Sequence, residues 1–143
     1  DGAPYIVPVW YHWDGDAFWV VGRKRSEWAH YLAADPRVSL VVDEAVPPIR
    51  KVICEGTAIV VEEAVGPYLE NGEKSIWNQI GEKHTGPRYL GDKAAEYRGS
   101  VNVEPCWTFR IVPKKLTTWQ GFGWHPRYKH TELYPDGDND ETP

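Results

Sequence analysis

The sequence predicts a mainly-β protein, with about six strands in a small antiparallel barrel and helices packed on its outside. Two observations carry this expectation. Runs of β-branched and aromatic residues recur along the chain, and turns containing Gly, Pro or Asp separate them. The 143 residues also include eight Trp and eight Tyr, which suits either a β-rich fold or a pocket that stacks on a planar ligand.

The N-terminal part contains four of the predicted strands and one helix. Residues 5–13 (YIVPVWYHW) and 17–21 (AFWVV) flank Asp14-Gly15, which is a strong hairpin signal. Ser26 is expected to cap a helix that ends at Asp35-Pro36. Two further strands are expected over 38–42 (VSLVV) and 50–62 (RKVICEGTAIVVE).

Residues 63–100 differ in character, because they are polar, contain Gly-Pro and Asn-Gly turn signals and show short helical patterns. We interpret this stretch as a helical insertion, with helices around 76–80 and near 93–97. Beyond it, two more strands are expected over 101–112 and 116–120.

Length and composition favour one folded domain. No linker or repeat divides the chain, so residues 1–134 are predicted to form one domain, followed by a disordered acidic tail over 135–143. The net charge of -5 argues against nucleic-acid binding. Neither a membrane span nor a secretory signal is evident, so a cytoplasmic location is expected. Cys54 and Cys106 fit no disulfide or metal pattern, and each is expected to be a small buried apolar group.

A cluster of cations stands at the start of the predicted helix, within residues 20–28 (VVGRKRSEW). Helix N-termini carry unpaired N–H groups and partial positive charge, and adjacent guanidinium groups add bidentate contacts to an anion. The candidate phosphate-binding residues are therefore Arg23, Lys24, Arg25 and Ser26. The alternative is a solvated basic turn, in which the cations would be slightly unfavourable beside the positive helix end. The residues alone leave both interpretations open.

Other residues form no recognisable catalytic or metal-binding motif. Strand alternation predicts that Trp10 points away from Tyr11 and Trp13, so about half of this aromatic run belongs in the core. The five His residues show no compact metal-ligand spacing, and the chain contains no Gly-x-Ser-x-Gly motif. The sequence therefore identifies no catalytic residue and no metal site.

Three blocks of sequence occur in an informative order. The first contains Asp1-Gly2-x-Pro4 and Asp35-Pro36-Arg37-Val38-Ser39-Leu40, and the second is the strand 50–56 (RKVICEG). The third is 107–121 (WTFRIVPKKLTTWQG). Together they resemble the FMN-binding split β-barrel family, which includes the pyridoxamine 5'-phosphate oxidases and related flavin- or deazaflavin-dependent oxidoreductases. The resemblance covers about residues 1–62 and 101–121.

The resemblance implies a homodimer of six-stranded antiparallel split β-barrels, with FMN held at each side of the subunit interface. In this family the strand at Val9 and Trp10 runs along the flavin ring. Lys51 stands where the family has a flavin-contacting Gln, and Trp119 matches a tryptophan that the partner chain contributes. The flavin phosphate would be held by Arg23, Lys24, Arg25 and Ser26.

Several family positions differ in this chain. Typical pyridoxamine phosphate oxidases carry cations at the positions of Ile6, Tyr11, Glu27 and Trp28. Their C-terminal Arg-Leu-His-Asp-Arg motif has only a loose counterpart around Arg127. We therefore expect a divergent substrate rather than vitamin B6 oxidation. The strand that usually precedes Asp-Gly-x-Pro is also absent and the first residue is not Met, so the sequence is expected to start late.

The function implied by the resemblance is an FMN-dependent oxidoreductase, in which hydride passes through the flavin to a small molecule that the sequence does not identify. The deazaflavin F420 is the alternative cofactor. A non-catalytic protein that holds flavin or haem on the same fold is the alternative of a different class. A haem protein would need an axial ligand, for which His12 is the candidate.

Overall fold

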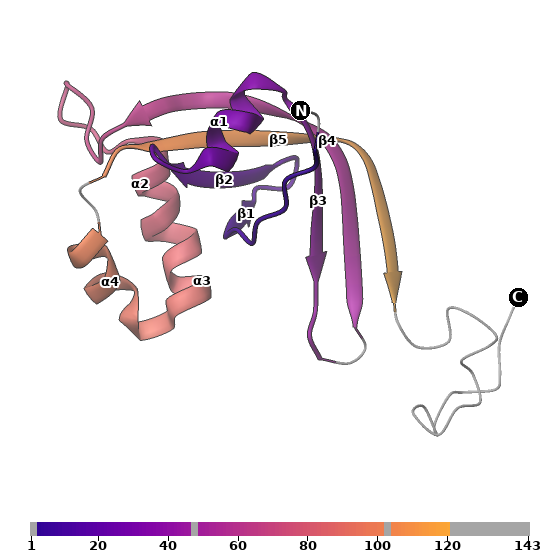
Figure 1. Ribbon diagram of the computed structural model, residues 1–143. Helices are drawn as coiled ribbons and strands as arrows, with labels where there is room; N and C mark the ends of the chain where they lie inside the picture. Colours follow the sequence, from indigo (N-terminus) through magenta and orange to yellow (C-terminus); the bar gives the residue numbers. More distant parts are fainter. Residues whose placement is uncertain (1–2, 47–48, 102–103, 121–143) are drawn as a thin grey trace, which may run out of the picture. The chain divides into compact units, whose positions relative to one another are not determined.

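The computed structural model describes residues 3–46, 49–101 and 104–120, and Figure 1 shows the order of their elements. The strands are β1 (Tyr11–Trp13), β2 (Phe18–Arg23), β3 (Arg37–Asp43), β4 (Arg50–Val65) and β5 (Cys106–Gln120). They form a five-stranded sheet in the order β1-β2-β5-β4-β3, in which the pairs β1–β2 and β2–β5 are antiparallel. The mainly-β prediction is confirmed. Closure of the sheet into a barrel stays a prediction.

Two strands differ in extent from those expected. β1 begins only at Tyr11, because Pro4 and Pro8 upstream have no N–H to donate to a ladder. The two strands expected over 101–112 and 116–120 are one strand, so the described residues contain five strands and not six. Pro113 removes one donor from the ladder but is compatible with extended backbone, and β5 therefore continues through it.

The chain divides into two compact units. The first consists of Asp1–Val38 and Gly56–Pro113, and the second of Ser39–Glu55 and Lys114–Pro143. Strands β3, β4 and β5 each contribute residues to both units. The expected acidic tail over 135–143 and the loose counterpart at Arg127 lie outside the described residues.

The core of the first unit is built on the β2–β5 ladder. Phe18 pairs with Ile111 and Val20 with Phe109, and all four side chains are buried. Alternate residues of β2 are buried, as expected for a strand that presents one face to a core. The hydrophobic effect of these large side chains therefore fixes the register that positions the end of β2.

The hairpin and the first helix form as the sequence predicts. Asp14 Oδ1 accepts hydrogen bonds from the backbone N–H groups of Asp16 and Ala17, each at 2.8 Å, and these close the turn between β1 and β2. Helix α1 (Glu27–Ala34) follows Ser26, which stands at its N-cap position, but the capping hydrogen bond expected from the Ser26 side chain is not formed. The ring of Trp28 in α1 lies 5.9 Å from that of Phe109, so the helix packs on the buried ladder.

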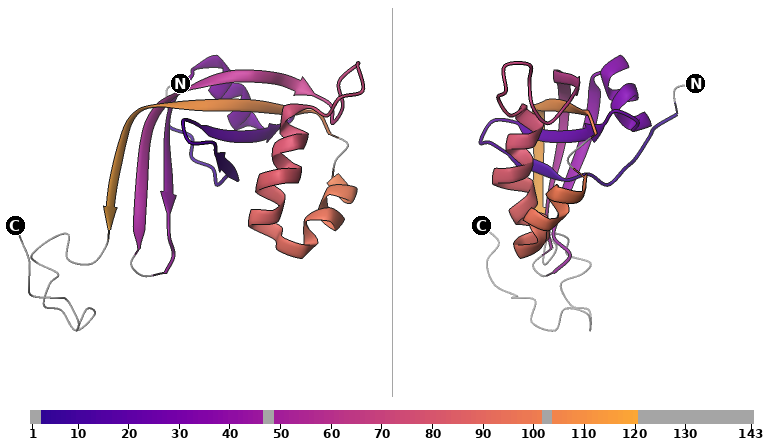
Figure 2. Two further views of the ribbon diagram at one scale, coloured as in Figure 1. Left: turned by 180° about the vertical axis from the view of Figure 1, so that it is seen from behind. Right: turned by 90° about the vertical axis from the view of Figure 1, so that its left-hand side faces the viewer.

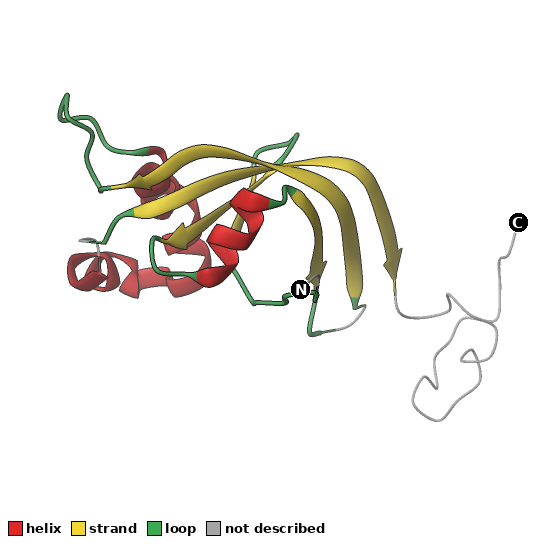
Figure 3. Cartoon of the chain, turned by 45° about the horizontal axis from the view of Figure 1, so that its top comes forward, coloured by secondary structure: helices red, strands yellow, loops and turns green. Residues whose placement is uncertain are grey.

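Between β4 and β5 the chain is helical over residues 76–101. The helical elements are α2 (Ile76–Ile80), the π-helical turn η1 (Gly81–Thr85), α3 (Gly86–Leu90), the 3-10 turn η2 (Gly91–Lys93) and α4 (Ala94–Val101). Figure 2 shows α2, η1 and α3 as one continuous run, and Figure 3 separates these helices from the strands by colour. No helix among the described residues is long and apolar enough to cross a membrane.

Candidate functional site

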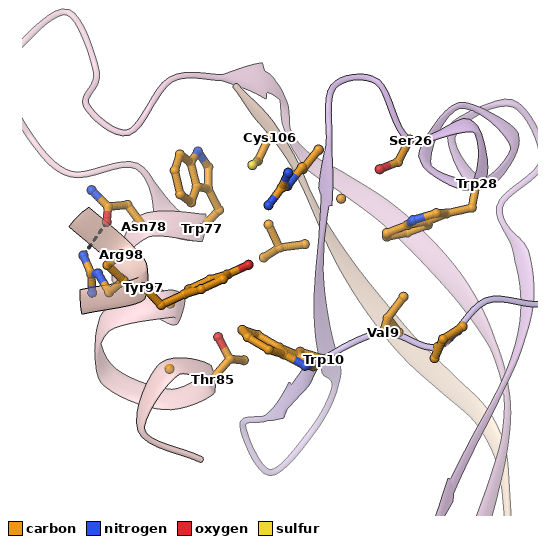
Figure 4. A pocket seen from close by; sticks show the side chains of 16 residues that line it. Val9, Trp10, Ser26, Trp28, Trp77, Asn78, Thr85, Tyr97, Arg98 and Cys106 are labelled. Carbon is orange, nitrogen blue, oxygen red and sulfur yellow. Dashed lines mark hydrogen bonds between the residues drawn. The ribbon is translucent and has the colours of Figure 1, made fainter. Parts of the chain in front are cut away.

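A cavity of about 360 Å³ lies within the first unit, between the strand end that carries the cations and the helical segment. Figure 4 shows its lining side chains. They come from the segment before β1, from β2, from the turn into α1, from the helical segment and from the start of β5. The lining residues are Pro8, Val9, Trp10, Val21, Gly22, Arg23, Ser26, Trp28, Trp77, Asn78, Gly81, Thr85, Gly86, Tyr97, Arg98 and Cys106.

Aromatic rings make up much of the cavity wall. Trp10 stacks on Tyr89 with ring centroids 5.2 Å apart and an interplanar angle of 4°, and its ring lies 5.8 Å from that of Tyr97. The rings of Trp28 and Trp77 enter from other elements, and Tyr97 points its hydroxyl toward the cavity (Figure 4). Flat apolar walls with a few polar groups are typical of sites for small planar ligands.

A buried carboxylate fixes the helical wall to the sheet. Glu62 in β4 accepts hydrogen bonds from the backbone N–H groups of Ile76 (2.7 Å) and Trp77 (3.1 Å) and from the hydroxyl of Thr108 (2.7 Å). It thereby caps the first turn of α2, which has no capping side chain of its own. The Trp77 indole donates to the carbonyl oxygen of Val65 at 2.9 Å. These bonds hold Trp77 in the cavity wall.

The π-helical turn η1 also forms part of the cavity wall. Gly81, Thr85 and Gly86 line the cavity, and a Cβ on Gly86 would fall 2.5 Å from the carbonyl oxygen of Gly81. Glycine is therefore required at position 86 for the turn to close. π-helical turns are often found at functional sites, because they displace side chains from their regular helical positions.

Arg98 is the cation of the helical wall. Its Nη2 donates to Asn78 Oδ1 at 2.7 Å and lies 3.8 Å from Glu82 Oε2, while Glu82 is also bonded by Lys74. The hydrogen bond from Lys74 is the main reason that the pKa of Glu82 is lowered. Two cations therefore share one carboxylate, which leaves positive charge at this wall.

The opposite wall carries the cationic turn predicted from the sequence. Arg23 and Ser26 line the cavity, whereas Lys24 and Arg25 are exposed and are not among its lining residues. The Ser26 side chain makes no capping hydrogen bond to α1. A Cβ on Gly22 would fall 2.8 Å from the Trp28 ring, so glycine lets that ring lie against β2.

Backbone contacts hold the cationic turn in shape. Lys24 N–H donates to the carbonyl oxygen of Pro105 at 2.9 Å, and Ser26 N–H donates to that of Arg23 at 2.9 Å. On the other side, the His30 ring nitrogen Nε2 lies 2.8 Å from the carbonyl oxygen of Lys24. The turn is thus tied to Pro105, just before β5, and to α1, which fixes the direction in which its side chains project.

Cys106 lines the cavity beside this turn, but its thiol is not a reactive group. Burial raises the pKa of Cys106 to about 11, and the partly opposing influence of Arg23 does not offset this effect. The side chain is therefore a neutral thiol at physiological pH, and a neutral thiol is a poor nucleophile. Cys54 is also buried, with its pKa raised by burial, as expected for a small apolar group.

Four of the eight predicted cofactor-binding residues line the cavity, namely Val9, Trp10, Arg23 and Ser26. Lys51 and Trp119 lie in the second unit, where Lys51 Nζ stands 5.2 Å from the centroid of the Trp119 ring and 3.3 Å from Asp43 Oδ2. His12 is not among the lining residues, and its ring stacks on His84 instead. The cavity geometry therefore gives no support to an axial haem ligand at His12.

The helical side of the cavity was not predicted from the sequence. Trp77, Asn78, Thr85, Tyr97 and Arg98 all come from the insertion, which the resemblance did not cover. The helical patterns around 76–80 and 93–97 were the available signal for Trp77, Asn78 and Tyr97, whereas Thr85 and Arg98 lie outside both patterns. Nothing in their spacing indicated which side of each helix would face a cavity.

Together, the antiparallel sheet and this aromatic, cation-lined cavity define a mainly-β domain built to hold a small ligand. Residues 1–105 match the family model described as pyridoxamine 5'-phosphate oxidase, and the chain belongs to that family. No curated protein sequence matches the chain significantly.

Solved structures agree with this fold. A conserved hypothetical protein from Mycobacterium tuberculosis is 25% identical with a TM-score of 0.56, over 84% of this chain and 71% of that one. An FAD-binding protein from Mesorhizobium loti is 20% identical with a TM-score of 0.53, over 82% of this chain and 76% of that one. The likeness shows that these chains share the fold.

Proposed function

We propose that this chain is a flavin-binding oxidoreductase of the pyridoxamine 5'-phosphate oxidase family, with FMN as its cofactor. The observation that carries the proposal is the composition of one cavity. A cationic turn at a helix start and a set of aromatic rings face the same space. FMN combines a phosphate with a flat heterocycle. The cavity offers a cation for the phosphate and aromatic rings for the heterocycle.

The phosphate end would be held by Arg23 and Ser26. A guanidinium group can make two parallel hydrogen bonds to phosphate oxygens, and the Ser26 hydroxyl is not used in capping α1. The positive end of the eight-residue helix α1 adds to the attraction. Lys24 and Arg25 are exposed and raise the local positive potential without touching the cavity.

The ring end would lie among Trp10, Tyr97, Trp28 and Trp77. Aromatic side chains stack on flat heterocycles and exclude water from them. When bound, the flavin supplies two-electron hydride chemistry, so the protein itself needs to supply binding and orientation. Cys106 does not add a nucleophile to the site, since burial raises its pKa to about 11.

The comparisons support a flavin as the class of cofactor, because the Mesorhizobium loti relative is an FAD-binding protein. The choice of FMN rests on the cationic turn, which suits a terminal phosphate. F420 is the alternative cofactor, since it also carries anionic groups and a flat ring. A non-catalytic flavin-binding protein is the alternative in which the cavity holds the cofactor without turnover.

The homodimer and the cofactor contacts of Lys51 and Trp119 are further parts of the proposal. They rest on the family resemblance alone. Within the second unit, the cation of Lys51 lies over the Trp119 ring, so the two side chains are already in contact with each other.

The absorption spectrum of the protein purified from its native host tests the proposed cofactor. The two visible and near-ultraviolet bands of oxidised flavin would support FMN or FAD, and mass spectrometry of the released cofactor would distinguish them. A single deazaflavin band would instead favour F420. A Soret band, or a protein that stays colourless after incubation with each cofactor, would contradict the proposal.

A further inference from the structure

Glu104 contacts both arginines of the cationic turn. Its Oε2 lies 3.8 Å from Arg23 Nη1 and 3.5 Å from Arg25 Nε. One carboxylate oxygen therefore forms ion pairs with two guanidinium groups. Both distances are longer than the ~2.7–2.9 Å of a tight charge-assisted hydrogen bond, and neither contact is bidentate. This is a loose arrangement, which another anion can replace.

Main-chain contacts place Glu104 beside the two arginines. Arg23 at the end of β2 pairs with Cys106 at the start of β5, and Lys24 N–H donates to Pro105 O at 2.9 Å. The Cys106 thiol lies 3.6 Å from the carbonyl oxygen of Glu104. Main-chain pairing thus holds the backbone of Glu104 near the arginines, so the residue stays beside the turn when its ion pairs are broken.

The charges at the turn do not balance. Arg23, Lys24 and Arg25 supply three positive charges. The acids beside them are Glu104, which is paired with both arginines, and Glu27 in the first turn of α1. A phosphate monoester carries about −1.5 to −2 charges and three acceptor oxygens near neutral pH. It therefore offers Arg23 more charge and more hydrogen bonds than one carboxylate oxygen does.

We infer that Glu104 is an internal stand-in for the phosphate of the ligand. It holds Arg23 and Arg25 when no phosphate is bound, gives up Arg23 when a phosphate binds, and thereby sets the affinity of the site for phosphorylated ligands. This inference rests on the proposed function, because it assumes that the turn binds the cofactor phosphate. Glu104 is a positioning residue and an affinity-determining residue, and it does not touch the reacting atoms.

Two opposite effects follow for the substitution Glu104→Gln. Without ligand, the two guanidinium groups lose their shared counter-charge and repel each other, so the melting temperature falls slightly. With FMN, no ion pair has to be broken and no carboxylate repels the phosphate, so binding becomes tighter. An exposed ion pair is worth little, and the expected gain in FMN affinity is therefore about three- to tenfold. A purely structural role for Glu104 would weaken both properties together.

The test is titration of FMN and of riboflavin into the wild-type protein and into E104Q, together with melting curves with and without FMN. The control is E55Q, which removes the same charge from the exposed pair between Glu55 and Lys115 in the second unit. We expect tighter FMN binding, unchanged riboflavin binding and a larger FMN-induced melting shift for E104Q alone. FMN binding that is unchanged or weaker in E104Q would overturn the inference. Should E104Q fail to fold, E104S decides the question by the same criteria.

The failure of the proposed function is recognised separately, from the wild-type protein. Wild-type protein that binds neither FMN nor riboflavin contradicts the proposed function. The comparison of wild type with E104Q is then made with inorganic phosphate as the probe. Tighter phosphate binding by E104Q supports the role of Glu104 at the turn, and equal or weaker binding overturns it.

Discussion

The imidazole rings of His12 and His84 stack with their centroids 3.7 Å apart and their planes 9° from parallel. His12 belongs to β1 and His84 to the π-helical turn η1, so the pair joins the strand to the helical wall of the cavity. Two stacked imidazoles are compatible while neutral, but they repel each other when both are protonated.

The surroundings of His12 make stability depend on pH. The pKa of His12 is lowered from 6.5, mainly by burial and then by His84; Arg88 also lowers it, while Asp14 opposes the shift. Because the folded chain disfavours the protonated ring, the stabilisation is present above about pH 6.5 and is lost as the pH falls through the lower folded-state pKa. We expect the melting temperature to fall between about pH 7 and pH 5, and H12Q to show a shallower fall. Identical pH profiles for both proteins would contradict the role of the pair.

Removal of the Glu62 carboxylate should release the helical wall from the sheet. Glu62→Ala leaves the N–H groups of Ile76 and Trp77 and the Thr108 hydroxyl without their acceptor in a buried setting. We expect a loss of roughly 3 kcal/mol in the free energy of unfolding, measured by urea denaturation. The control Thr108→Val removes one donor only and should cost about 1 kcal/mol. An E62A protein as stable as the wild type would show that α2 does not need this cap.

Substitution of Gly86, at the π-helical turn, can be compared with the same substitution of Gly99 on α4. In Gly86→Ala the new Cβ meets the Gly81 carbonyl oxygen at 2.5 Å, so the turn must shift. We expect a loss of about 1–3 kcal/mol and weaker flavin binding. In Gly99→Ala, on α4, the Cβ meets nothing within 4 Å, and the better helix propensity of Ala should add about 0.5–1 kcal/mol. Equal effects of the two substitutions on urea denaturation would argue against a requirement for Gly86.

Trp10 should contribute to binding of the flavin ring and not of the phosphate. Trp10→Ala removes a lining ring that stacks on Tyr89, and we expect about tenfold weaker binding of both FMN and riboflavin. Flavin fluorescence titration measures both affinities. Trp13 packs on Phe18 and is not among the lining residues, so W13A serves as the control. A loss confined to FMN would show that Trp10 acts on the phosphate end instead.

The sheet side of the cavity could be predicted from the sequence. The Asp14-Gly15 hairpin and the Ser26 helix start are local signals, and the turn between β2 and α1 lies between them along the chain. Local signals therefore placed Arg23 and Ser26 at the end of a strand and the start of a helix, where they line the cavity. Whether they bind a cofactor stays a prediction.

The helical side could not be predicted, because tertiary contacts decide it. Gly86-Pro87 reads as a helix break, yet the chain stays helical through it by opening into a π-helical turn. The cap of α2 comes from Glu62, which is 14 residues upstream of Ile76 and on another element. Likewise, Pro113-Lys114-Lys115 separated the two strands expected over 101–112 and 116–120, whereas long-range pairing keeps β5 extended through Pro113.

The most direct test of the proposed cofactor site is the substitution Arg23→Ala, with FMN and riboflavin titrated in parallel. We expect the wild type to bind FMN more tightly than riboflavin. R23A should lose about 10- to 100-fold in FMN affinity, because it loses a charge-assisted contact to the phosphate, and should bind riboflavin nearly as the wild type does. R37A removes an exposed arginine that is not among the lining residues, and it should change neither affinity. Equal losses for FMN and riboflavin in R23A would contradict a phosphate site at this turn.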